Sequence, residues 1–294
     1  QRVILFAFLI IVLLLIGVLF LAARLVRNRG RANDALQQQK EQMQVLSDQL
    51  KEATNAKIAF FTNVSHDLRT PMNAIIGFTS LAITHSDKPE ILNNYLQKIM
   101  ISSNHLLSLI NDVLDMSRIE SGKVTIKEVE CSLPTLMHDL RSILQSDIKA
   151  KNFNFYIDTV DVDHENIFCD KLRLNQILLN LLGNSMKFTP PGGTVGVKVV
   201  EENTAPEGYA DFKFIVFDTG IGMSEKFMEK IFKPFSREEN STVSGIQGTG
   251  LGLAITKNIV SMMGGSIDVK SEKNKGSEFT VSLRLHTSNS QKKI

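Results

Sequence analysis

The chain has 294 residues, of which 43% are hydrophobic, and a formal net charge of +2 at pH 7. This length allows one or two domains with hydrophobic cores besides any membrane segment, and the balanced charge excludes a nucleic-acid-binding surface spread over the whole chain. The two cysteines, Cys131 and Cys169, lie in apolar segments without CxxC spacing. We interpret them as buried thiols in a reducing compartment, which argues against a disulfide or a metal site. Because the chain begins at Gln1, we expect it to be part of a longer protein.

The first stretch, residues 3–23, is apolar throughout and contains no charged side chain. A helix of this length, at about 1.5 Å per residue, spans roughly 30 Å, the thickness of the hydrocarbon core of a bilayer. Four arginines follow it: Arg24, Arg27, Arg29 and Arg31. The length of the stretch and the arginines after it disfavour a signal peptide and place the rest of the chain on the cytoplasmic side. We predict a transmembrane helix at residues 1–23 and a membrane-integral protein.

Residues 24–59 are predicted to form a basic flank and a coiled-coil signalling linker. Apolar side chains recur at heptad a and d spacing from residue 32 onward: Leu36, Met43, Leu46, Leu50 and Ala53. This spacing favours a short parallel coiled coil and hence a homodimer, although about three heptads also allow a single solvated helix. The seam then steps by four residues to Lys57 and again to Phe61, the signature of a stutter that locally unwinds a coiled coil.

Residues 60–121 are predicted to form an all-α helical hairpin. The apolar residues of its first helix recur at steps of three and four: Phe61, Val64, Leu68, Pro71, Ile75, Phe78 and Ala82. His66 lies off this stripe, so we expect its side chain to face solvent. Pro71 has no N–H group for the carbonyl of Asp67, which predicts a bend in the helix one turn from His66.

The second helix of the hairpin begins near Pro89, a residue that suits the first helical turn, and runs to about Glu120. Its apolar side consists of Leu92, Leu96, Ile99, Leu106, Ile110, Val113 and Met116. Two such hairpins can bury their apolar faces against each other, so we expect a dimeric four-helix bundle.

A second domain is predicted over residues 122–286, with residues 287–294 as a C-terminal tail or linker. Alternating apolar residues, Val124, Ile126 and Val129, predict its first strand. The elements expected after it are helix 134–150, strand 153–160, helix 171–188, strands 194–201 and 211–218, helix 251–263, and a hairpin of strands 266–271 and 278–285. Because strands and helices do not alternate regularly, this order indicates an α+β two-layer sandwich and disfavours a Rossmann sheet.

The helix predicted at residues 171–188 carries two asparagines and a lysine on one face. Asp170 can cap this helix, which presents Asn180, Asn184 and Lys187 at positions i, i+4 and i+7. Neutral oxygen ligands suit Mg²⁺, which keeps most of its waters and completes its shell with phosphate oxygens. A lysine one turn further on can neutralise those phosphates. The helix therefore predicts a site for a magnesium-bound phosphate group.

Two further segments have the chemistry of a nucleotide site. A strand ends in Asp218, whose carboxylate can accept a hydrogen bond from the amino group of adenine, and Gly220 and Gly222 would let a flat ring approach. Further on, GTGLGL at residues 248–253 opens a helix whose free N–H groups can bind phosphate. Residues 236–247 between these segments are polar without an apolar pattern, so we expect a mobile flap over the site.

Five motifs in this order resemble those of membrane-bound sensor histidine kinases. SHDLRTP resembles the phosphoacceptor H box and NQILLNLLGNSMKF resembles the N box, while DTGIGM, IFKPFSRE and GTGLGL resemble the G1, F and G2 boxes. The matches extend from residue 60 to about residue 285. The resemblance implies a Bergerat-type (GHKL-type) ATP-binding fold in the second domain, and ATP and Mg²⁺ as cofactors. It also implies a homodimer in the inner (cytoplasmic) membrane of a bacterial cell, with the kinase domains in the cytoplasm.

The activity that the resemblance implies is that of a protein-histidine kinase. His66 would be autophosphorylated from ATP and would pass the phosphoryl group to an aspartate of a response-regulator receiver domain. That receiver would be a separate protein or a C-terminal part of the full-length chain, since the wording of the H box resembles that of hybrid kinases. Asp67 would be the base that activates His66, Thr70 would serve a receiver phosphatase activity, and Arg237 would assist the γ-phosphate.

The ATP site implied by the same resemblance comprises Asn180, Asn184, Lys187, Asp218, Gly220, Gly222, Gly248, Thr249, Gly250, Leu251 and Gly252. Within it, Asn184, with Asn180 close by, would be the Mg²⁺ ligand, and Asp218 would recognise adenine.

Two other classes of protein fit part of the pattern. The ATPases of the gyrase, chaperone and mismatch-repair type share the nucleotide fold but resemble E-x-x-x-N-[AS]-x-D at the N box, where the glutamate activates water. This chain has Asn180 and Lys187 at the two acidic positions, which favours transfer to His66 over hydrolysis. A non-catalytic dimeric signalling adaptor would be expected to have lost His66, Asn184 or Gly250, and all three are present.

Overall fold

The structure is a computed structural model. It describes residues 2–202, 204–236, 238 and 249–288, apart from the side chains of residues 2–13, 23, 26, 28–36, 53 and 56. The chain forms two compact units, residues 1–62 and 63–294.

The first unit consists of helix, all of it within α1 (Arg2–Thr84). The predicted coiled-coil segment is helical, and its seam residues Met43, Leu46 and Leu50 are 73%, 66% and 67% exposed in this single chain. Within the part of the chain that the structure describes, no helix is long and apolar enough to cross a membrane. The side chains of residues 3–13, in the predicted transmembrane stretch, lie outside that part.

The second unit begins with the predicted hairpin, made of the end of α1 and of α2 (Pro89–Glu120). Pro89 lies in the first turn of α2, as expected. Helix α1 runs through Pro71 without a break. The expected apolar stripe is buried in part, since Val64, Pro71 and Ala82 are buried whereas Phe61 is exposed.

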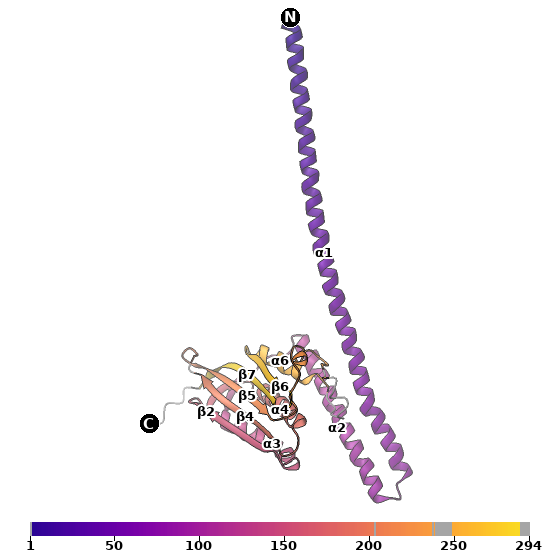
Figure 1. The fold of residues 1–294 in the computed structure, drawn as a ribbon, viewed down its shortest axis with the longest axis vertical. Helices are drawn as coiled ribbons and strands as arrows, with labels where there is room; N and C mark the ends of the chain where they lie inside the picture. Colours follow the sequence, from indigo (N-terminus) through magenta and orange to yellow (C-terminus); the bar gives the residue numbers. More distant parts are fainter. Residues whose placement is uncertain (1, 203, 237, 239–248, 289–294) are drawn as a thin grey trace. The chain divides into compact units, whose positions relative to one another are not determined.

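The rest of the second unit contains one mixed sheet. Its seven strands in the described chain are β1 (Val129–Ser132), β2 (Asn154–Val160), β3 (Asn166–Cys169), β4 (Thr194–Glu202), β5 (Tyr209–Asp218), β6 (Ser266–Glu272) and β7 (Gly276–Thr287). Their order is β1-β3-β7-β5-β4-β2, with β6 paired to β7. All described pairings are antiparallel except β2 with β4, which is parallel. The helices of this domain are α3 (Leu133–Ala150), α4 (Lys171–Phe188), α5 (Glu225–Met228) and α6 (Gly252–Met262) (Figure 1).

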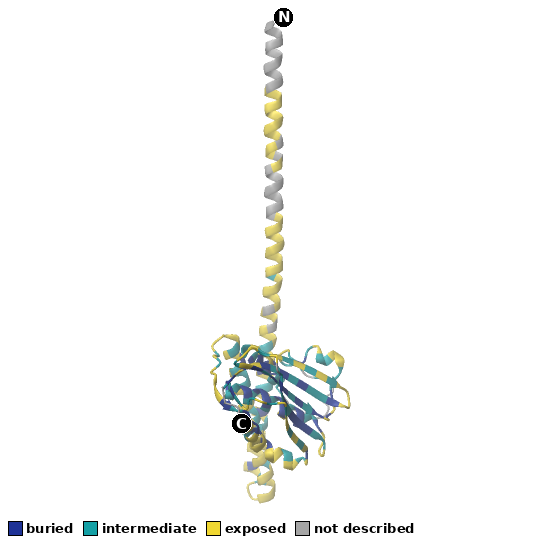
Figure 2. Cartoon of the chain, turned by 90° about the vertical axis from the view of Figure 1, so that its left-hand side faces the viewer, coloured by how far each residue is buried: buried dark blue, intermediate teal, exposed yellow. Residues whose placement is uncertain are grey.

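The core lies between the sheet and helices α3, α4 and α6. Every second residue of β5 is buried, and the register pairs Val216 with Val197 of β4 and with Phe279 of β7. This alternation is visible as dark and lighter residues along the strands in Figure 2. The fully buried leucine and isoleucine side chains of α4 are Leu174, Ile177, Leu178, Leu181 and Leu182. Burial of such a side chain contributes about 1.5–3 kcal/mol, so α4 is held firmly and its other face can carry polar groups.

The predicted order of helices and strands is confirmed, with three exceptions: the first strand begins later than expected, and strand β3 and the short helix α5 were not predicted. The strand predicted from Val124, Ile126 and Val129 begins only at Val129, because its ladder is limited to the four residues that β3 offers as partners. Strand β3 itself was not predicted, since four residues are too few to show a period. Cys131 and Cys169 lie on these two strands as buried free thiols, which confirms their predicted burial.

Candidate active site

Helix α1 presents the His66 ring to solvent. The side chain of His66 is 78% exposed, whereas that of Asp67 is 16% exposed. Nδ1 of His66 lies 3.3 Å from Oδ1 of Asp67. When Nδ1 carries the proton, its N–H can donate a hydrogen bond to that carboxylate, and Nε2 is then the nitrogen with the free lone pair. The Thr70 hydroxyl donates to the carbonyl oxygen of His66 at 3.3 Å. The predicted exposure of His66 is confirmed.

Helix α4 places its polar residues as the sequence predicted. The side chain of Asp170 caps it by accepting the backbone N–H of Arg173 at 3.1 Å. Asn180, Asn184 and Lys187 all line one cavity. Nδ2 of Asn180 donates to the hydroxyl of Thr256 on α6 at 2.7 Å, and this contact assigns Oδ1 as the atom that is left to accept hydrogen bonds or bind a cation.

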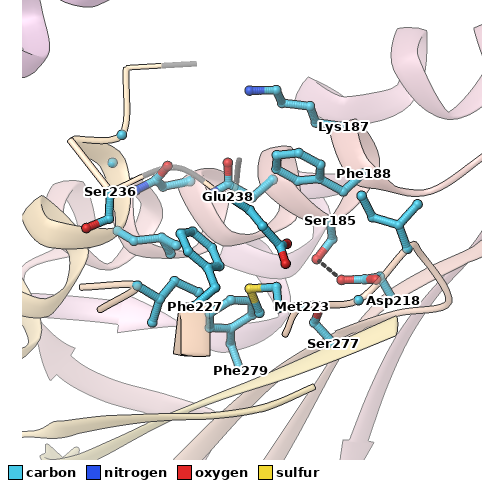
Figure 3. Close-up of a pocket in the computed structure, with 18 of the residues that line it drawn as sticks. Ser185, Lys187, Phe188, Asp218, Met223, Phe227, Ser236, Glu238, Ser277 and Phe279 are labelled. Carbon is cyan, nitrogen blue, oxygen red and sulfur yellow. Dashed lines mark hydrogen bonds between the residues drawn. The ribbon is translucent and has the colours of Figure 1, made fainter. Parts of the chain in front are cut away.

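Asp218 ends β5 at the side of this cavity and is 9% exposed. Its Oδ1 accepts the backbone N–H of Gly220 at 2.8 Å, and its Oδ2 accepts the hydroxyl of Ser185 at 3.0 Å (Figure 3). Burial raises the pKa of Asp218, and these hydrogen bonds oppose the rise. The carboxylate is thus fixed in orientation and keeps lone pairs for a further donor.

Two glycines near Asp218 allow close approach between backbone segments. Gly222 has φ +61°, and a Cβ atom there would lie 2.0 Å from the carbonyl oxygen of Glu272. Gly276 has φ +105°, and a Cβ atom there would lie 1.9 Å from the carbonyl oxygen of Asp218. The Cβ side of Gly222 is therefore filled by the protein's own backbone, while Gly222 also lines the cavity. These glycines hold the loop after β5 against the β6–β7 turn.

The turn before α6 is built as a phosphate-binding turn would be. Gly250 has φ +67°, and its carbonyl oxygen accepts the N–H of Phe235 at 2.9 Å. Leu251 is fully buried, so its side chain anchors the turn and only its backbone can face a ligand. Helix α6 then begins at Gly252 without a side-chain cap, which leaves N–H groups of its first turn for an anion.

These segments surround one cavity of about 500 Å³, a volume suited to a cofactor-sized ligand. The structure brings the following predicted residues together in its wall: Asn180, Asn184, Lys187, Asp218, Gly222, Thr249, Gly250 and Gly252. Gly220 and Leu251 are not among the described residues that line it, although Gly220 donates its N–H to Asp218. His66, Asp67 and Thr70 are not among the described residues that line it. Arg237, Gly248 and most of the predicted flap lie outside the described residues.

The apolar part of the cavity was not predicted from the sequence. Its wall includes Phe188, Met223, Phe227 and Phe279 (Figure 3), and also Ile231. A flat aromatic base needs such apolar surfaces on both faces. The available signal was that Phe188, Met223 and Ile231 belong to the N, G1 and F boxes themselves. Ser185, which orients Asp218, was missed because it lies within an apolar helix face.

The donors around the cavity fit Mg²⁺ bound with a nucleotide. Among the described residues there is no group of three or more His, Cys, Asp or Glu side chains that could hold a metal ion by itself. The amide oxygens of Asn180 and Asn184 are hard, neutral ligands, and such a set suits a cation that takes its remaining ligands from water and phosphates.

Comparison with protein families finds matches for two consecutive parts of the chain. Residues 56–122 match the family described as the His Kinase A (phospho-acceptor) domain. Residues 169–287 match the family described as histidine kinase-, DNA gyrase B-, and HSP90-like ATPase. The two matches follow each other in the order in which the sequence motifs occur.

Curated relatives are similar over most of this chain. The sensor protein GacS of Pseudomonas syringae pv. syringae is 40% identical over 238 residues, which cover 80% of this chain and 26% of that protein. The signal transduction histidine-protein kinase BarA of Escherichia coli (strain K12) is 34% identical over 265 residues, 88% of this chain and 28% of that protein. The chain therefore spans about a quarter of the length of these relatives.

Two solved structures are similar in fold. Full-length ShkA in complex with AMPPNP has a TM-score of 0.56 and 28% identity, covering 76% of this chain and 45% of that chain. The histidine kinase ThkA in complex with the response regulator protein TrrA has a TM-score of 0.59 and 26% identity, covering 76% of this chain and 60% of that chain.

Proposed function

We propose that this chain, which carries a phosphoacceptor domain followed by an ATPase domain of the histidine kinase type, is the kinase core of a sensor histidine kinase in a two-component system. It transfers the γ-phosphoryl group of ATP to His66 and then to an aspartate of a response-regulator receiver domain. The observation that carries this proposal is one cavity that joins the asparagines of α4, Asp218 and the turn before α6, in a chain that also exposes His66 beside Asp67.

Binding of ATP follows from the groups around the cavity. Asp218 accepts the amino group of adenine while Ser185 and Gly220 hold its carboxylate in place. The first N–H groups of α6 and the Lys187 ammonium receive the phosphates. Mg²⁺, when bound at Asn184 and Asn180, neutralises phosphate charge in the transition state.

Transfer to histidine requires little from the protein beyond positioning and proton control. Nε2 of His66 attacks the γ-phosphorus, so a P–N bond forms while the bond from phosphorus to the β,γ-bridging oxygen breaks and ADP leaves. Asp67 accepts the hydrogen bond of the Nδ1 proton and stabilises the positive charge that develops on the ring. Arg237 is proposed to assist the γ-phosphate. Because no carboxylate occupies position 180, the site lacks the water-activating glutamate of the related ATPases.

A receiver phosphatase activity is proposed for Thr70. Its hydroxyl lies one turn from His66 on the same helix face and donates to the His66 carbonyl oxygen in the free chain. A receiver that docks at His66 would bring its acyl phosphate near this hydroxyl, which can then orient an attacking water.

The setting of the enzyme is part of the proposal. We infer a membrane-integral homodimer in the inner membrane of a bacterial cell, with residues 24–294 in the cytoplasm. The uncharged stretch 3–23 and the arginines after it support the membrane anchor. Exposed apolar residues on both helices of the hairpin, such as Ile76 and Leu96, support a dimeric four-helix bundle that would cover them.

The proposal is tested by labelling the chain with γ-labelled ATP and Mg²⁺. The label is expected to be acid-labile, as a phosphoramidate is, and to be absent from His66→Gln. His85→Gln, in the turn directly after the same helix, serves as the matched control and should label like the unmodified chain. Acid-stable label, or label that persists in His66→Gln, would contradict the proposed function.

A further inference from the structure

Helix α2 forms part of the wall of the nucleotide cavity, although it belongs to the phosphoacceptor hairpin. His105, Ser108 and Asp112 line the cavity and lie three and four residues apart, which places them on one helix face. Asp115 and Met116 continue this face, and α2 packs against α6 there. The hairpin and the catalytic domain therefore share the cavity in this structure.

Asp115 anchors the catalytic domain to α2. Its Oδ2 accepts Nε2 of Gln176 at 2.8 Å, and its Oδ1 lies 3.6 Å from Nη1 of Arg173. Nη1 of Arg173 also donates to Oε1 of Gln176 at 2.7 Å, so the three side chains form one network. The side chains of Arg173 and Asp115 are only 15% and 23% exposed, which makes their attraction less screened than that of a surface pair. Met116 adds a contact, because its sulfur accepts Nδ2 of Asn258 at 3.7 Å.

Asp112 reaches the turn that is expected to bind phosphate. Asp112 lines the cavity together with Thr249, Gly250 and Gly252 of that turn, and the Thr249 hydroxyl accepts the backbone N–H of Leu251 at 3.0 Å. A carboxylate thus faces the cavity beside the turn expected to bind phosphate, and helix N-termini bind carboxylates as well as phosphates. Burial raises the pKa of Asp112, the nearby Thr249 hydroxyl lowers it, and the nearby charge of Asp115 raises it. Burial in the docked arrangement therefore disfavours the charged form of Asp112.

We propose that Asp112 occupies the place of a nucleotide phosphate at the turn before α6, so that α2 holds the catalytic domain in an inactive, docked arrangement until Mg-ATP displaces it. His66 of the same chain is not among the described residues that line the cavity, and we take the docked arrangement as one that precedes phosphoryl transfer. The inference rests on the proposed function, because it takes ATP as the nucleotide. It makes nucleotide binding the step that frees the catalytic domain to reach a histidine.

The test compares nucleotide affinities of variants of the 294-residue chain. Asp112→Asn removes the competing charge and keeps the size of the side chain, and Asp115→Asn weakens the anchor to Arg173 and Gln176. Glu120→Gln removes one charge from an exposed position of the same helix and serves as the control. The probes are Mg-AMPPNP, which carries the phosphates, and adenosine, which lacks them.

Asp112→Asn is expected to bind Mg-AMPPNP roughly fivefold or more tightly than the unmodified chain, at the low end of typical couplings between sites. Its affinity for adenosine should change much less, because adenosine does not compete with Asp112. Asp115→Asn should act in the same direction, and Glu120→Gln should leave both affinities unchanged. Equal shifts for both probes, or no gain for Mg-AMPPNP in either variant, would overturn the inference. If the unmodified chain bound no nucleotide at all, the proposed function itself would fail.

Discussion

The two side chains on which the proposed chemistry depends need opposite surroundings. His66 is 78% exposed, as a nucleophile must be if a separate domain is to deliver the phosphoryl group and a receiver is to remove it. Asp218 is 9% exposed, and a hydrogen bond to adenine gains strength where water is excluded. The structure provides both environments through simple means, an outward helix face for His66 and the end of a central strand for Asp218.

Because Asp218 is buried, we predict that replacing its charge raises the stability of the fold and lowers the affinity for ATP. Its folded-state pKa is raised, so the protonated form is favoured by folding. That contribution to stability is present below the unfolded pKa and is lost as the pH rises through the folded pKa. Asp218→Asn resembles the protonated acid, and its amide can keep a hydrogen bond to both Gly220 and Ser185. The variant is therefore expected to melt at a higher temperature than the unmodified chain at pH 7, with the difference shrinking as the pH falls toward 4.

The same substitution should weaken the binding of ATP, because the side-chain amide N–H₂ would face the amino group of adenine. A mispaired buried polar group costs about 1–3 kcal/mol, so affinity should fall by roughly tenfold or more. Thermal melts across the pH range and titration with an ATP analogue measure both effects. A lower melting temperature at pH 7, together with unchanged affinity for the ATP analogue, would show that Asp218 stabilises the fold and does not bind adenine.

At the scale of elements, the site depends on how α4 and α6 meet. Nδ2 of Asn180 on α4 donates to Thr256 of α6, and Thr256 is 1% exposed. Gly252 begins α6 directly against Asn180, since a Cβ atom there would lie 2.5 Å from its Oδ1. The contact sets the distance between the proposed magnesium ligands and the phosphate-binding turn.

Gly252→Ala is predicted to displace Asn180 and to weaken Mg-ATP binding while the sheet stays folded. The matched control is Gly183→Ala on α4, where a Cβ atom would meet nothing within 4 Å. Replacing glycine by alanine inside a helix stabilises it by about 1 kcal/mol, so Gly183→Ala should raise the melting temperature and leave nucleotide affinity unchanged. Titration with Mg-AMPPNP and thermal melts of both variants decide the point. Equal affinity in the two variants would mean that the close contact at Gly252 has no part in binding.

The elements that the sequence predicts well are those with a long apolar period. The helix expected at residues 171–188 is observed over those same residues, because its five fully buried leucine and isoleucine side chains recur with the helical period. Strand β3 was not predicted, because its four residues are too few to show an apolar period. The missed parts of the site share another cause, which is distance along the chain. Ser185 is paired with Asp218, 33 residues away, and no local pattern in α2 predicts that Asp112 reaches the cavity.

For the whole molecule, the first unit has apolar groups that a single helix cannot bury. Leu46 and Leu50 are 66% and 67% exposed in the single chain, and they occupy the predicted d and a positions of the coiled coil. Polar residues cover most of the remaining helix surface. A second copy of this segment, packed in parallel, would cover the seam and would connect an event at the membrane to both hairpins of the dimer.

Leu46→Glu is therefore predicted to weaken the homodimer. In a parallel coiled coil the two glutamates would face each other at a d position, where they lose hydration and repel. Val45→Glu is the matched control, because Val45 is 59% exposed but lies off the seam. The measurement is light scattering on a dilution series of each variant in the same detergent. The Leu46→Glu dimer should dissociate at a protein concentration about tenfold or more above that of Val45→Glu, which corresponds to a difference of about 1.4 kcal/mol in the free energy of dimerisation. The hairpin bundle still links the protomers, so weakening and not complete loss is expected. If both variants dissociated at the concentration of the unmodified chain, residues 32–59 would be a solvated single helix, and the dimer would depend on the hairpin alone.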